Sequence, residues 1–321
     1  MHAIYDLRLA PLSFDFLNYL AFLYMYSKIN RFERIDLELV CPNFRHTTEI
    51  EKSYPPGYNE RKLFNVCVDL VPLADFIENF LINRSGVSSI TKINYKHIFP
   101  EDYDHSRIPL DYKTPITRLP VTEKVIWQSF NLTKIKPLFL KSTDKAKAYV
   151  KSKTKGKQFI SLTLRKTPYN SARNISDDVT ANTYKFLNDI NENISVVVIP
   201  DQDDFFGLKS YKNSMWDFWE EAALDLDIRL ALYTGSLFNV AFSTGPAMLL
   251  LYSENKHLIL GTNNKKSSVS TVDFFSRKGP EFEKQRPWSK SDQKVDWTEY
   301  SELENKKNLT KILCDYVSLV N

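Results

Sequence analysis

The sequence predicts an α/β fold with two Rossmann-like domains that face each other across a cleft, and a C-terminal helix that closes the chain. The chain has 321 residues, more than one hydrophobic core usually organises, so two domains are expected. Patterns typical of strands alternate with patterns typical of helices in both halves, which indicates parallel sheets. A hydrophobic content of 43% and an aromatic content of 13% are sufficient for packed cores.

The first domain is placed at residues 1–150 and begins with a strand, a helix and a strand. The strands are expected at Ala3–Leu7, which is mainly apolar, and at Arg34–Pro42, where apolar and charged residues alternate. Between them, Phe14–Asn30 is apolar nearly all round and predicts a buried helix, with Ser13 as its N-cap. Such a unit implies that its two strands lie parallel in one sheet.

The rest of the first domain is less regular. Residues 43–59 include two adjacent prolines and predict a long loop, and loops of this length often have a function. Helical periodicity resumes over Lys62–Ile82, with a break or kink expected at Pro72. A third strand is expected at Val87–Asn94, and residues 95–137 predict irregular structure that leads to a linker.

The second domain is placed at residues 151–321, after a helix at Ser142–Lys153 and a turn at Gly156. Its strands are expected at Lys157–Leu164, Ile194–Pro200, Leu237–Phe242 and Leu258–Leu260. Its helices are expected at Asp177–Asn188, Met215–Leu232, Pro246–Tyr252 and Asn305–Val320, of which the last closes the chain. Continuous apolar strands such as ISVVVIP are typical of the centre of a parallel sheet.

The composition and the motifs exclude several classes of protein. The 43 basic and 39 acidic residues give a net charge of +4, which permits an anionic ligand but is no nucleic-acid footprint. The three cysteines lack CxxC or metal spacing, as expected in a reducing cytoplasm. The most apolar run, Phe16–Tyr26, is too short for a membrane span and has no basic leader. The motifs of acyl hydrolases, P-loop enzymes, zincins and dinucleotide oxidoreductases are missing from the sequence.

Basic and small polar residues follow the first strand of the second domain. Arg165 comes directly after this strand, and Arg173 and Asn174 come just before a helix that Ser176 and Asp177 can cap. A guanidinium holds a phosphate through two parallel donors, and a helix N-terminus adds free amides and a partial positive charge. The pattern predicts a diphosphate site. The alternative is that both arginines pair with acidic residues at the surface.

A second candidate is the Ser243–Pro246 turn, which follows a buried strand and opens a helix. Hydroxyl groups of Ser243 and Thr244 and free backbone amides can bind phosphate or sugar oxygens, and Gly245 allows a close approach of the backbone. Pro246 suits the first turn of a helix. The alternative is an ordinary connection between a strand and a helix.

Acidic residues at the ends of strands are the third candidate. Asp201 and Asp203 follow ISVVVIP, and such a pair can hold a divalent metal beside a diphosphate. A solvated acidic loop is the alternative, in which Asp201 reaches a ribose or sugar hydroxyl. At the other end of the chain, Asp15 in the first turn of a buried helix is a candidate general base, with His46 as its competitor. The alternative for Asp15 is an acid favoured by the helix dipole.

A resemblance to a known group of proteins is carried by three segments, ISLTLRKTPYNSARN, VVVIPD and DIRLALYTGSLFNVAFSTGPAMLLLYS. They resemble the C-terminal domain of a poorly characterised bacterial family with the pattern TLRxxxYxxxRN, LRxALYxxxxxN and [NS]xGP. The opening YDLRLAPLSFDFLNYL and the strand IDLELVCP resemble its N-terminal half, so the likeness spans most of the chain. This family is similar to GT-B glycosyltransferases, in which an acceptor-binding N-terminal domain faces a nucleotide-sugar-binding C-terminal domain. The resemblance implies a sugar transferase of surface-polysaccharide or related glycan assembly.

The resemblance assigns donor-binding roles residue by residue. The matching positions are Thr163, Arg165, Tyr169, Arg173 and Asn174 in the first motif, Arg229 and Tyr233 in the second, and Ser243, Thr244, Gly245 and Pro246 in the third. It implies that Arg165 and Arg173 bind the donor diphosphate and that the Ser243 turn binds phosphate or the donor sugar. Arg229 is placed with them, with a structural role for Arg229 and Tyr233 as the alternative. The chain departs from the family in having Ser243 and Thr244 where two asparagines are usual, and in lacking a glycine-rich loop near its N-terminus.

These features lead us to expect a metal-independent glycosyltransferase without a cofactor, in which cationic side chains and helix N-termini stabilise the departing phosphate. Its expected partners are a nucleotide-sugar donor and a glycan or lipid-linked acceptor, without nucleic acid. The expected location is the cytoplasm, and peripheral membrane association is compatible with it. Two alternatives remain open: a non-catalytic nucleotide- or glycan-binding protein of the same fold, and a metal-dependent transferase that uses Asp201 and Asp203.

Overall fold

The computed structural model describes residues 2–7, 13–40, 60–83, 116–117, 121–167, 171–201, 216–267 and 270–320. The chain divides into two compact units, Met1–Phe139 and Leu140–Asn321. The expected boundary after residue 150 is wrong, because helix α4 (Asp144–Lys153) packs against α7 (Leu226–Gly235) of the second unit. The carboxylate of Asp227 in α7 accepts hydrogen bonds from the amide (2.8 Å) and the hydroxyl (2.5 Å) of Thr143, the N-cap of α4.

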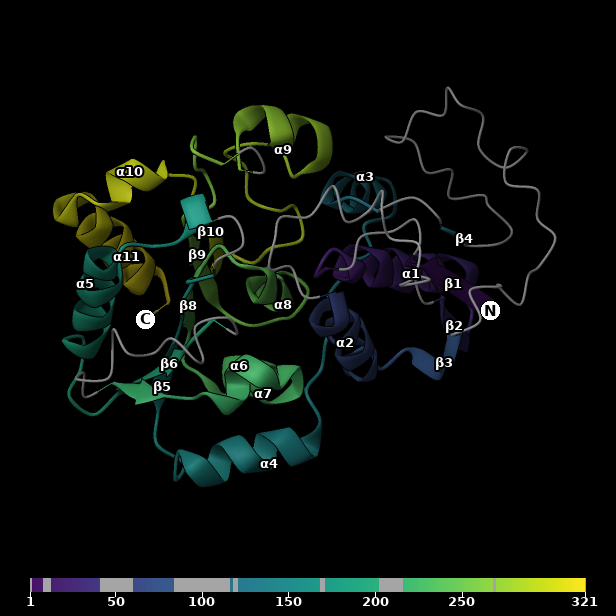
Figure 1. Ribbon diagram of the computed structural model, residues 1–321, viewed down its shortest axis with the longest axis horizontal. Helices are drawn as coiled ribbons and strands as arrows, with labels where there is room; N and C mark the ends of the chain where they lie inside the picture. Colours follow the sequence, from purple (N-terminus) through teal and green to yellow (C-terminus); the bar gives the residue numbers. More distant parts are fainter. Residues whose placement is uncertain are drawn as a thin grey trace. The chain divides into compact units, whose positions relative to one another are not determined.

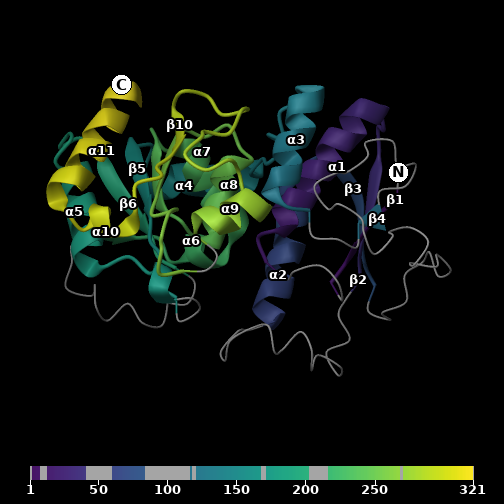
Figure 2. The ribbon, with the colours of Figure 1, turned by 90° about the horizontal axis from the view of Figure 1, so that it is seen from above.

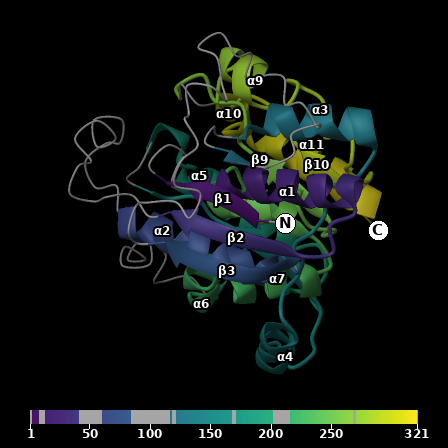
Figure 3. The ribbon, with the colours of Figure 1, turned by 90° about the vertical axis from the view of Figure 1, so that its right-hand side faces the viewer.

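The first unit contains a four-stranded sheet in the order β3-β2-β1-β4, in which each pair of neighbouring strands is parallel. Its strands are β1 (His2–Asp6), β2 (Ile35–Val40), β3 (Ile77–Asn83) and β4 (Ile116–Thr117). The helices described in this unit, α1 (Phe16–Asn30), α2 (Glu60–Leu70) and α3 (Glu123–Thr133), lie on one side of the sheet (Figures 2 and 3). The ring of Tyr5 in β1 lies 4.6 Å from Phe16 and 4.9 Å from Tyr19 of α1 between ring centroids, so aromatic packing joins the sheet to this helix.

Two expectations for the first unit are corrected, and a third lies outside the described residues. Helix α1 begins at Phe16 with Asp15 at the N-cap position, so Ser13 does not cap it. The helix expected at Lys62–Ile82 ends at Leu70. A 3-10 turn, η2 (Val71–Leu73), contains the proline, and β3 follows it. The third strand of the chain that the structure describes is β3, which pairs with β2. The strand expected at Val87–Asn94 lies outside the described residues.

The second unit contains a six-stranded sheet in the order β10-β9-β8-β5-β6-β7, again with parallel neighbours. Its strands are β5 (Phe159–Thr163), β6 (Ser195–Ile199), β7 (Asp217–Phe218), β8 (Asn239–Phe242), β9 (His257–Leu260) and β10 (Gln293–Val295). Figures 1 and 2 show helices on both sides of this sheet, which explains why β5, β8 and β9 are buried along their whole length and consist mainly of apolar residues.

The helices of the second unit divide between the two faces of its sheet. One face is covered by α5 (Asp177–Asn188), α10 (Tyr300–Leu303) and α11 (Lys306–Val320), and the other by α6 (Glu221–Leu224), α7 and α8 (Met248–Leu251), as Figures 1 and 2 show. A seven-residue helix, α9 (Val272–Lys278), follows β9. The expected helix at Asp177–Asn188 is confirmed, and the expected C-terminal helix is α11, which packs on α5. The helix expected at Met215–Leu232 is wrong, because this stretch forms β7, α6 and most of α7.

In the parts of the chain described above, no helix combines the length and the apolar character that crossing a bilayer requires.

Candidate functional site

The carboxyl ends of the strands in the six-stranded sheet meet at a topological switch point. Strand β5 lies between β8 and β6, so the chain leaves β5 toward one side of the sheet and later adds β8 on the other side. In open α/β sheets, ligands bind at the carboxyl ends of the strands at such a point. The two loops that border it here begin at Leu164, after β5, and at Ser243, after β8.

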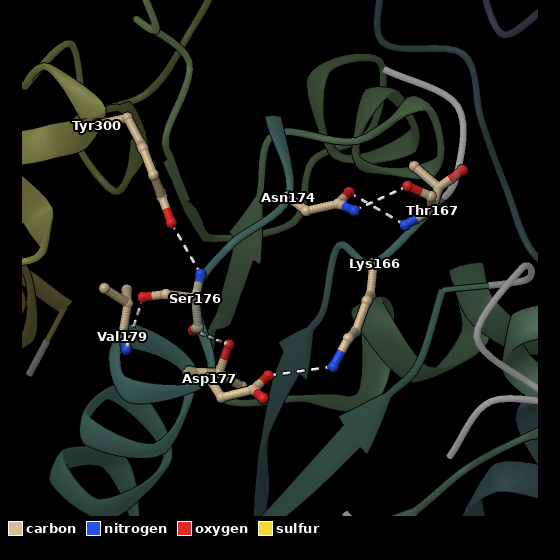
Figure 4. A network of polar contacts seen from close by, with 8 residues as sticks. Lys166, Thr167, Asn174, Ser176, Asp177, Val179 and Tyr300 are labelled. Atoms are coloured by element: carbon tan, nitrogen blue, oxygen red, sulfur yellow. Dashed lines mark hydrogen bonds and ion pairs between the residues drawn. The ribbon is translucent and has the colours of Figure 1, made fainter. Parts of the chain in front are cut away.

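Arg165 lies in the first of these loops and is only 6% exposed. Its backbone carbonyl accepts a hydrogen bond from the amide of Ile175 (3.4 Å), whose side chain belongs to the apolar core. Between them, the side chain of Asn174 bonds both backbone groups of Thr167. It accepts from the amide (3.0 Å) and donates to the carbonyl (2.7 Å), as Figure 4 shows. Asn174, expected to contact the donor, therefore closes the loop that carries Arg165.

Arg173 lies in a 3-10 turn, η4 (Ser171–Arg173), and reaches across to the end of β8. One terminal nitrogen of its guanidinium donates to the hydroxyl (2.9 Å) and to the backbone carbonyl (3.2 Å) of Ser243. The structure thus brings together two residues that the sequence placed in separate motifs. Because a guanidinium is planar and delocalised, this contact fixes the orientation of the whole guanidinium group at the switch point.

Asn264 is a residue of this site that the sequence analysis did not identify. It follows β9, is 1% exposed, and its side-chain amide donates to the backbone carbonyl of Ala172 (2.8 Å), next to Arg173. Nothing in a sequence marks a contact whose acceptor is a backbone carbonyl. The sequence does mark the turn that carries Asn264, because Gly261 follows β9 directly. Gly261 has a φ of +71°, and a Cβ atom there would lie 3.2 Å from Ile175 Cδ1.

The N-terminus of α5 lies beside the same loop. Ser176 caps the helix as expected, since its hydroxyl accepts from the amide of Val179 (3.4 Å), and its own amide donates to the hydroxyl of Tyr300 (2.7 Å). Lys166 forms an ion pair with Asp177 (3.1 Å) in the first turn. Figure 4 shows how these contacts hold the start of the helix against the loop. The partial positive charge of a helix N-terminus therefore adds to that of the two arginines.

The turn after β8 is fixed to the neighbouring strand. The amide of Ser243 donates to the carbonyl of Leu260 (2.8 Å) at the end of β9, and Thr244 is the N-cap residue of a 3-10 turn, η6 (Gly245–Ala247). The carbonyl of Thr244 accepts from the amide of Ala247 (3.1 Å), and α8 follows. The turn keeps Ser243 and Gly245 partly exposed, while Thr244 is 9% exposed and the proline behind them is buried.

Two residues of the expected donor site lie inside the protein. Thr163 has no exposed surface, and its hydroxyl lies 2.9 Å from the hydroxyl of Tyr233. Arg229 is 1% exposed; its Nε donates to the carbonyl of Ala222 (2.7 Å) and a terminal nitrogen to that of Pro200 (3.5 Å). These contacts give Thr163, Arg229 and Tyr233 a structural role, in place of the donor contact expected for the first two.

Of the other residues expected in the second unit or as the competing base, the structure describes only Asp201. Asp201 follows β6 at the carboxyl edge of the sheet and is partly buried. His46, Tyr169 and Asp203 lie outside the described residues. Within the described ranges, which do not include Asp203, no three His, Cys, Asp or Glu side chains are arranged to hold a metal ion.

Asp15 lies in the first unit, at the turn that follows β1 and precedes α1. It is exposed, and one of its carboxylate oxygens accepts a hydrogen bond from the hydroxyl of Ser13 (2.8 Å). The hydroxyl of Ser13 in turn accepts from the amide of Asp15 (3.1 Å). This pair of contacts holds the carboxylate at the N-terminus of α1, at the carboxyl end of the first strand.

Comparison with solved structures gives the same architecture. The structure resembles an ADP-heptose LPS heptosyltransferase II of E. coli at 15% identity, with a TM-score of 0.52 and coverage of 98% of both chains. It also resembles a family 9 glycosyl transferase of Veillonella parvula at 10% identity, with a TM-score of 0.54 and coverage of 97% of this chain and 89% of the other. The chain has the GT-B fold. No protein-family model and no curated protein matches the sequence.

In this GT-B protein, the candidate site of the second unit consists of side chains from loops that follow different strands. Arg165 and Arg173 come from the connection between β5 and α5, Ser243 from the end of β8, and Asn264 from the end of β9. Hydrogen bonds that join Arg173 to Ser243, Asn174 to Thr167 and Asn264 to Ala172 hold η4 and the residue after it in place. Such a preorganised group of cationic and polar donors is suited to binding an anion.

Proposed function

We propose that this protein is a glycosyltransferase that moves a sugar from a nucleotide-activated donor to a hydroxyl group of a glycan or lipid-linked acceptor, without a metal ion. The observation that carries the proposal is the placement of Arg165 and Arg173, together with the Ser243 turn and the N-terminus of α5, at the switch point of the second sheet. The GT-B fold supports it, because known transferases share this architecture.

In the proposed reaction, the bond between the anomeric carbon of the sugar and the diphosphate breaks, and the diphosphate departs with the electron pair. Arg165 and Arg173 would stabilise the negative charge that develops on the diphosphate, which takes the place of a metal ion. Arg173 is suited to this role because its contact with Ser243 fixes the plane of the guanidinium in advance. Asp201, at the end of the neighbouring strand β6, would accept a hydrogen bond from the ribose or the sugar.

The acceptor hydroxyl forms the new glycosidic bond to the anomeric carbon and loses its proton. We assign the proton to the carboxylate of Asp15, because it is exposed and is oriented by Ser13 at the end of the first strand of the first unit. His46 is the competing base. We also propose that the protein acts in the cytoplasm and that its acceptor belongs to surface-glycan assembly. This class of acceptor is supported by the similarity to an LPS heptosyltransferase and to a family 9 transferase.

The proposal is tested first by binding. Calorimetric titration with ADP, UDP, GDP and CMP should identify one nucleotide that binds, and the melting temperature should rise with its concentration. Arg165→Ala should weaken that binding about 10- to 100-fold, since a hydrogen bond to a charged group contributes about 1.5–3 kcal/mol. The matched control is Lys185→Ala, which removes one positive charge at an exposed position in the last turn of α5, away from the switch point.

Transfer is tested with the sugar derivatives of the nucleotide that binds. Asp15→Asn should retain donor binding and lose turnover, and activity in excess EDTA should equal activity in buffer. Nucleotide binding without transfer or donor hydrolysis would favour a non-catalytic binding protein. If EDTA abolishes activity, the protein is a metal-dependent transferase, and the metal would be held by Asp201 and Asp203. Full activity of Arg165→Ala would show that Arg165 does not belong to the site.

A further inference from the structure

A second hollow lies at the same edge of the six-stranded sheet, away from the switch point. It is an open pocket of about 830 Å³ where β9 and β10 end, in the size range of small-molecule sites. Residues that follow β9, such as Asn263, form one wall, and Asp296–Glu299, which follow β10, form another. None of the residues that bind or position the proposed donor diphosphate lines it.

The walls of this pocket are held in place by hydrogen bonds within the protein. The side-chain amide of Asn263 donates to the carbonyl of Trp297 (3.2 Å), and its backbone carbonyl accepts from the amide of Tyr300 (3.0 Å). The indole of Trp297 donates to the carbonyl of Lys284 (3.2 Å), which fixes the segment that carries Phe282. The pocket is therefore formed before a ligand binds, which reduces the entropy that binding costs.

Aromatic rings form the apolar part of the pocket. Phe282 and Trp297 both line it, with their ring centroids 5.2 Å apart, and the ring of Phe275 packs against Trp297 at 5.1 Å in an edge-to-face contact. Trp297 is 9% exposed, so Phe282, which is partly exposed, presents the accessible ring. A partly exposed ring beside polar groups suits a ligand that has both an apolar face and hydrogen-bonding groups, as a sugar ring does.

The polar part of the pocket is mostly acidic. Among its lining residues, the carboxylates are Asp273, Glu283, Asp296, Glu299 and Glu302, and the cation is Lys265. The hydroxyl of Ser301 donates to Glu299 and holds the pKa of that carboxyl below its ordinary value, so it is ionised at neutral pH. Carboxylates accept hydrogen bonds from hydroxyl and ammonium groups and repel phosphates and acidic sugars.

The pocket is connected to the donor site through two consecutive residues. Asn263 forms part of its wall, and Asn264 donates to the carbonyl of Ala172 in the turn that carries Arg173. The edge of the sheet thus offers cationic groups at the switch point and acidic and aromatic groups at β9 and β10. A ligand with an anionic part and a sugar part that carries no negative charge complements both regions.

We propose that this pocket is a saccharide subsite that binds an amine-bearing sugar unit of the substrate. The inference rests on the proposed function, since it assigns a part of that substrate to a separate place in the second unit. The ring of the sugar would lie against Phe282, and its hydroxyl and ammonium groups would donate to the carboxylates around it.

The test uses saccharides in the absence of nucleotide. The probes are a tetramer of glucosamine, which is cationic, and the corresponding tetramer of N-acetylglucosamine, which is neutral. Calorimetry should show at least about tenfold tighter binding of the cationic tetramer, and added salt should weaken it. Equal affinity for both tetramers, or no binding of either, would overturn the proposal.

Two variants link the binding to this pocket. Glu283→Gln combined with Glu302→Gln neutralises two exposed carboxylates of the pocket and should reduce the affinity for the cationic tetramer about tenfold. The matched control is Glu281→Gln combined with Glu304→Gln, which removes two exposed carboxylates from the same segments outside the pocket and should bind as the wild type does. If both double variants bind equally, the site is elsewhere and the proposal fails.

The nucleotide titration separates this inference from the proposed function. A protein that binds a nucleotide but neither tetramer disproves the saccharide subsite and leaves the proposed transferase intact. A protein that binds the cationic tetramer in this pocket but no nucleotide has lost the basis of the proposed transferase, and the pocket stands alone as a glycan-binding site.

Discussion

Buried polar side chains lie at both ends of the strands in the six-stranded sheet, here called the amino edge and the carboxyl edge. The two groups differ in which parts of the protein they join. At the amino edge, the pairing register aligns Ser161, Asn239, His257 and Gln293 in one row across β5, β8, β9 and β10, and each is at most 2% exposed. This row joins the strands of the sheet to one another and to the turns before them. At the carboxyl edge, Arg173 and Asn264 join loops that follow different strands.

Buried asparagine side chains have two different roles in this sheet. Asn239 bonds the hydroxyls of two serines and the backbone carbonyls of Tyr233 and Lys256, so its whole capacity is used inside the core. Asn264 bonds the carbonyl of Ala172 and thereby places the neighbouring Arg173. The amino edge should therefore determine the stability of the sheet, and the carboxyl edge should determine the affinity for a ligand.

The largest expected effect is that of Asn239→Ala on stability. The change removes four hydrogen bonds, each with a net contribution of about 1 kcal/mol, and leaves buried partners without them, so the free energy of unfolding should fall by about 3–4 kcal/mol. Urea denaturation followed by circular dichroism measures this. Asn308→Ala, at an exposed position of α11, is the control, and a loss at Asn239 no larger than the loss at Asn308 would contradict the role of the row.

The next effect is a pH dependence that comes from His257. Burial lowers the pKa of this imidazole from 6.5 to about 4, so between these values the unfolded chain binds a proton that the folded protein does not. The stability is therefore fully present above pH 6.5 and should fall by about 1.4 kcal/mol for each pH unit as the pH decreases toward 4.

His257→Gln tests this pH dependence. The difference in the free energy of unfolding between the wild type and His257→Gln should shrink as the pH falls from 6.5, measured by denaturation at several pH values. Asn308→Ala, which changes no titratable group, should give a profile parallel to that of the wild type. Parallel profiles for His257→Gln and the wild type would show that His257 is not the group responsible.

The smallest effect on stability, and the one that sharpens the comparison, is that of Asn264→Ala. The change removes one hydrogen bond at the edge of the sheet and should reduce stability much less than Asn239→Ala. It should nevertheless weaken nucleotide binding about tenfold, because about 1.4 kcal/mol is lost when Arg173 is no longer held in place. Calorimetry on folded Asn264→Ala measures this, and unchanged affinity would limit Asn264 to a structural role.

Much of the fold follows from local patterns in the second unit. The strands β5, β6, β8 and β9 are short apolar runs with clear polar ends, and α5 begins at a serine cap, so their positions follow from the sequence. The elements of the first unit are harder to predict from the sequence, because the apolar spacing of IENFLIN in β3 fits a helix as well as a strand. Helix α3 was missed because its apolar residues lie in a stretch rich in prolines and charges.

The candidate site was predictable where position relative to a strand decides it. Arg173 and Ser243 stand near strand ends, so a shared edge brings them together. The role of Asn174 was not predictable, because an amide that binds a ligand and an amide that closes its own loop have the same sequence signature. The burial of Thr163 and Arg229 depends on the packing of α6 and α7, where one long helix was expected.

The row of buried polar residues at the amino edge also has a consequence for dynamics. Because it joins four strands at the end farthest from the switch point, the loops at the other end can open locally without separating the strands. Backbone amides of β5 and β8 should then exchange with solvent only through global unfolding, while amides of the η4 and η6 turns exchange through smaller openings. The protein can thus admit and release a ligand with its sheet intact.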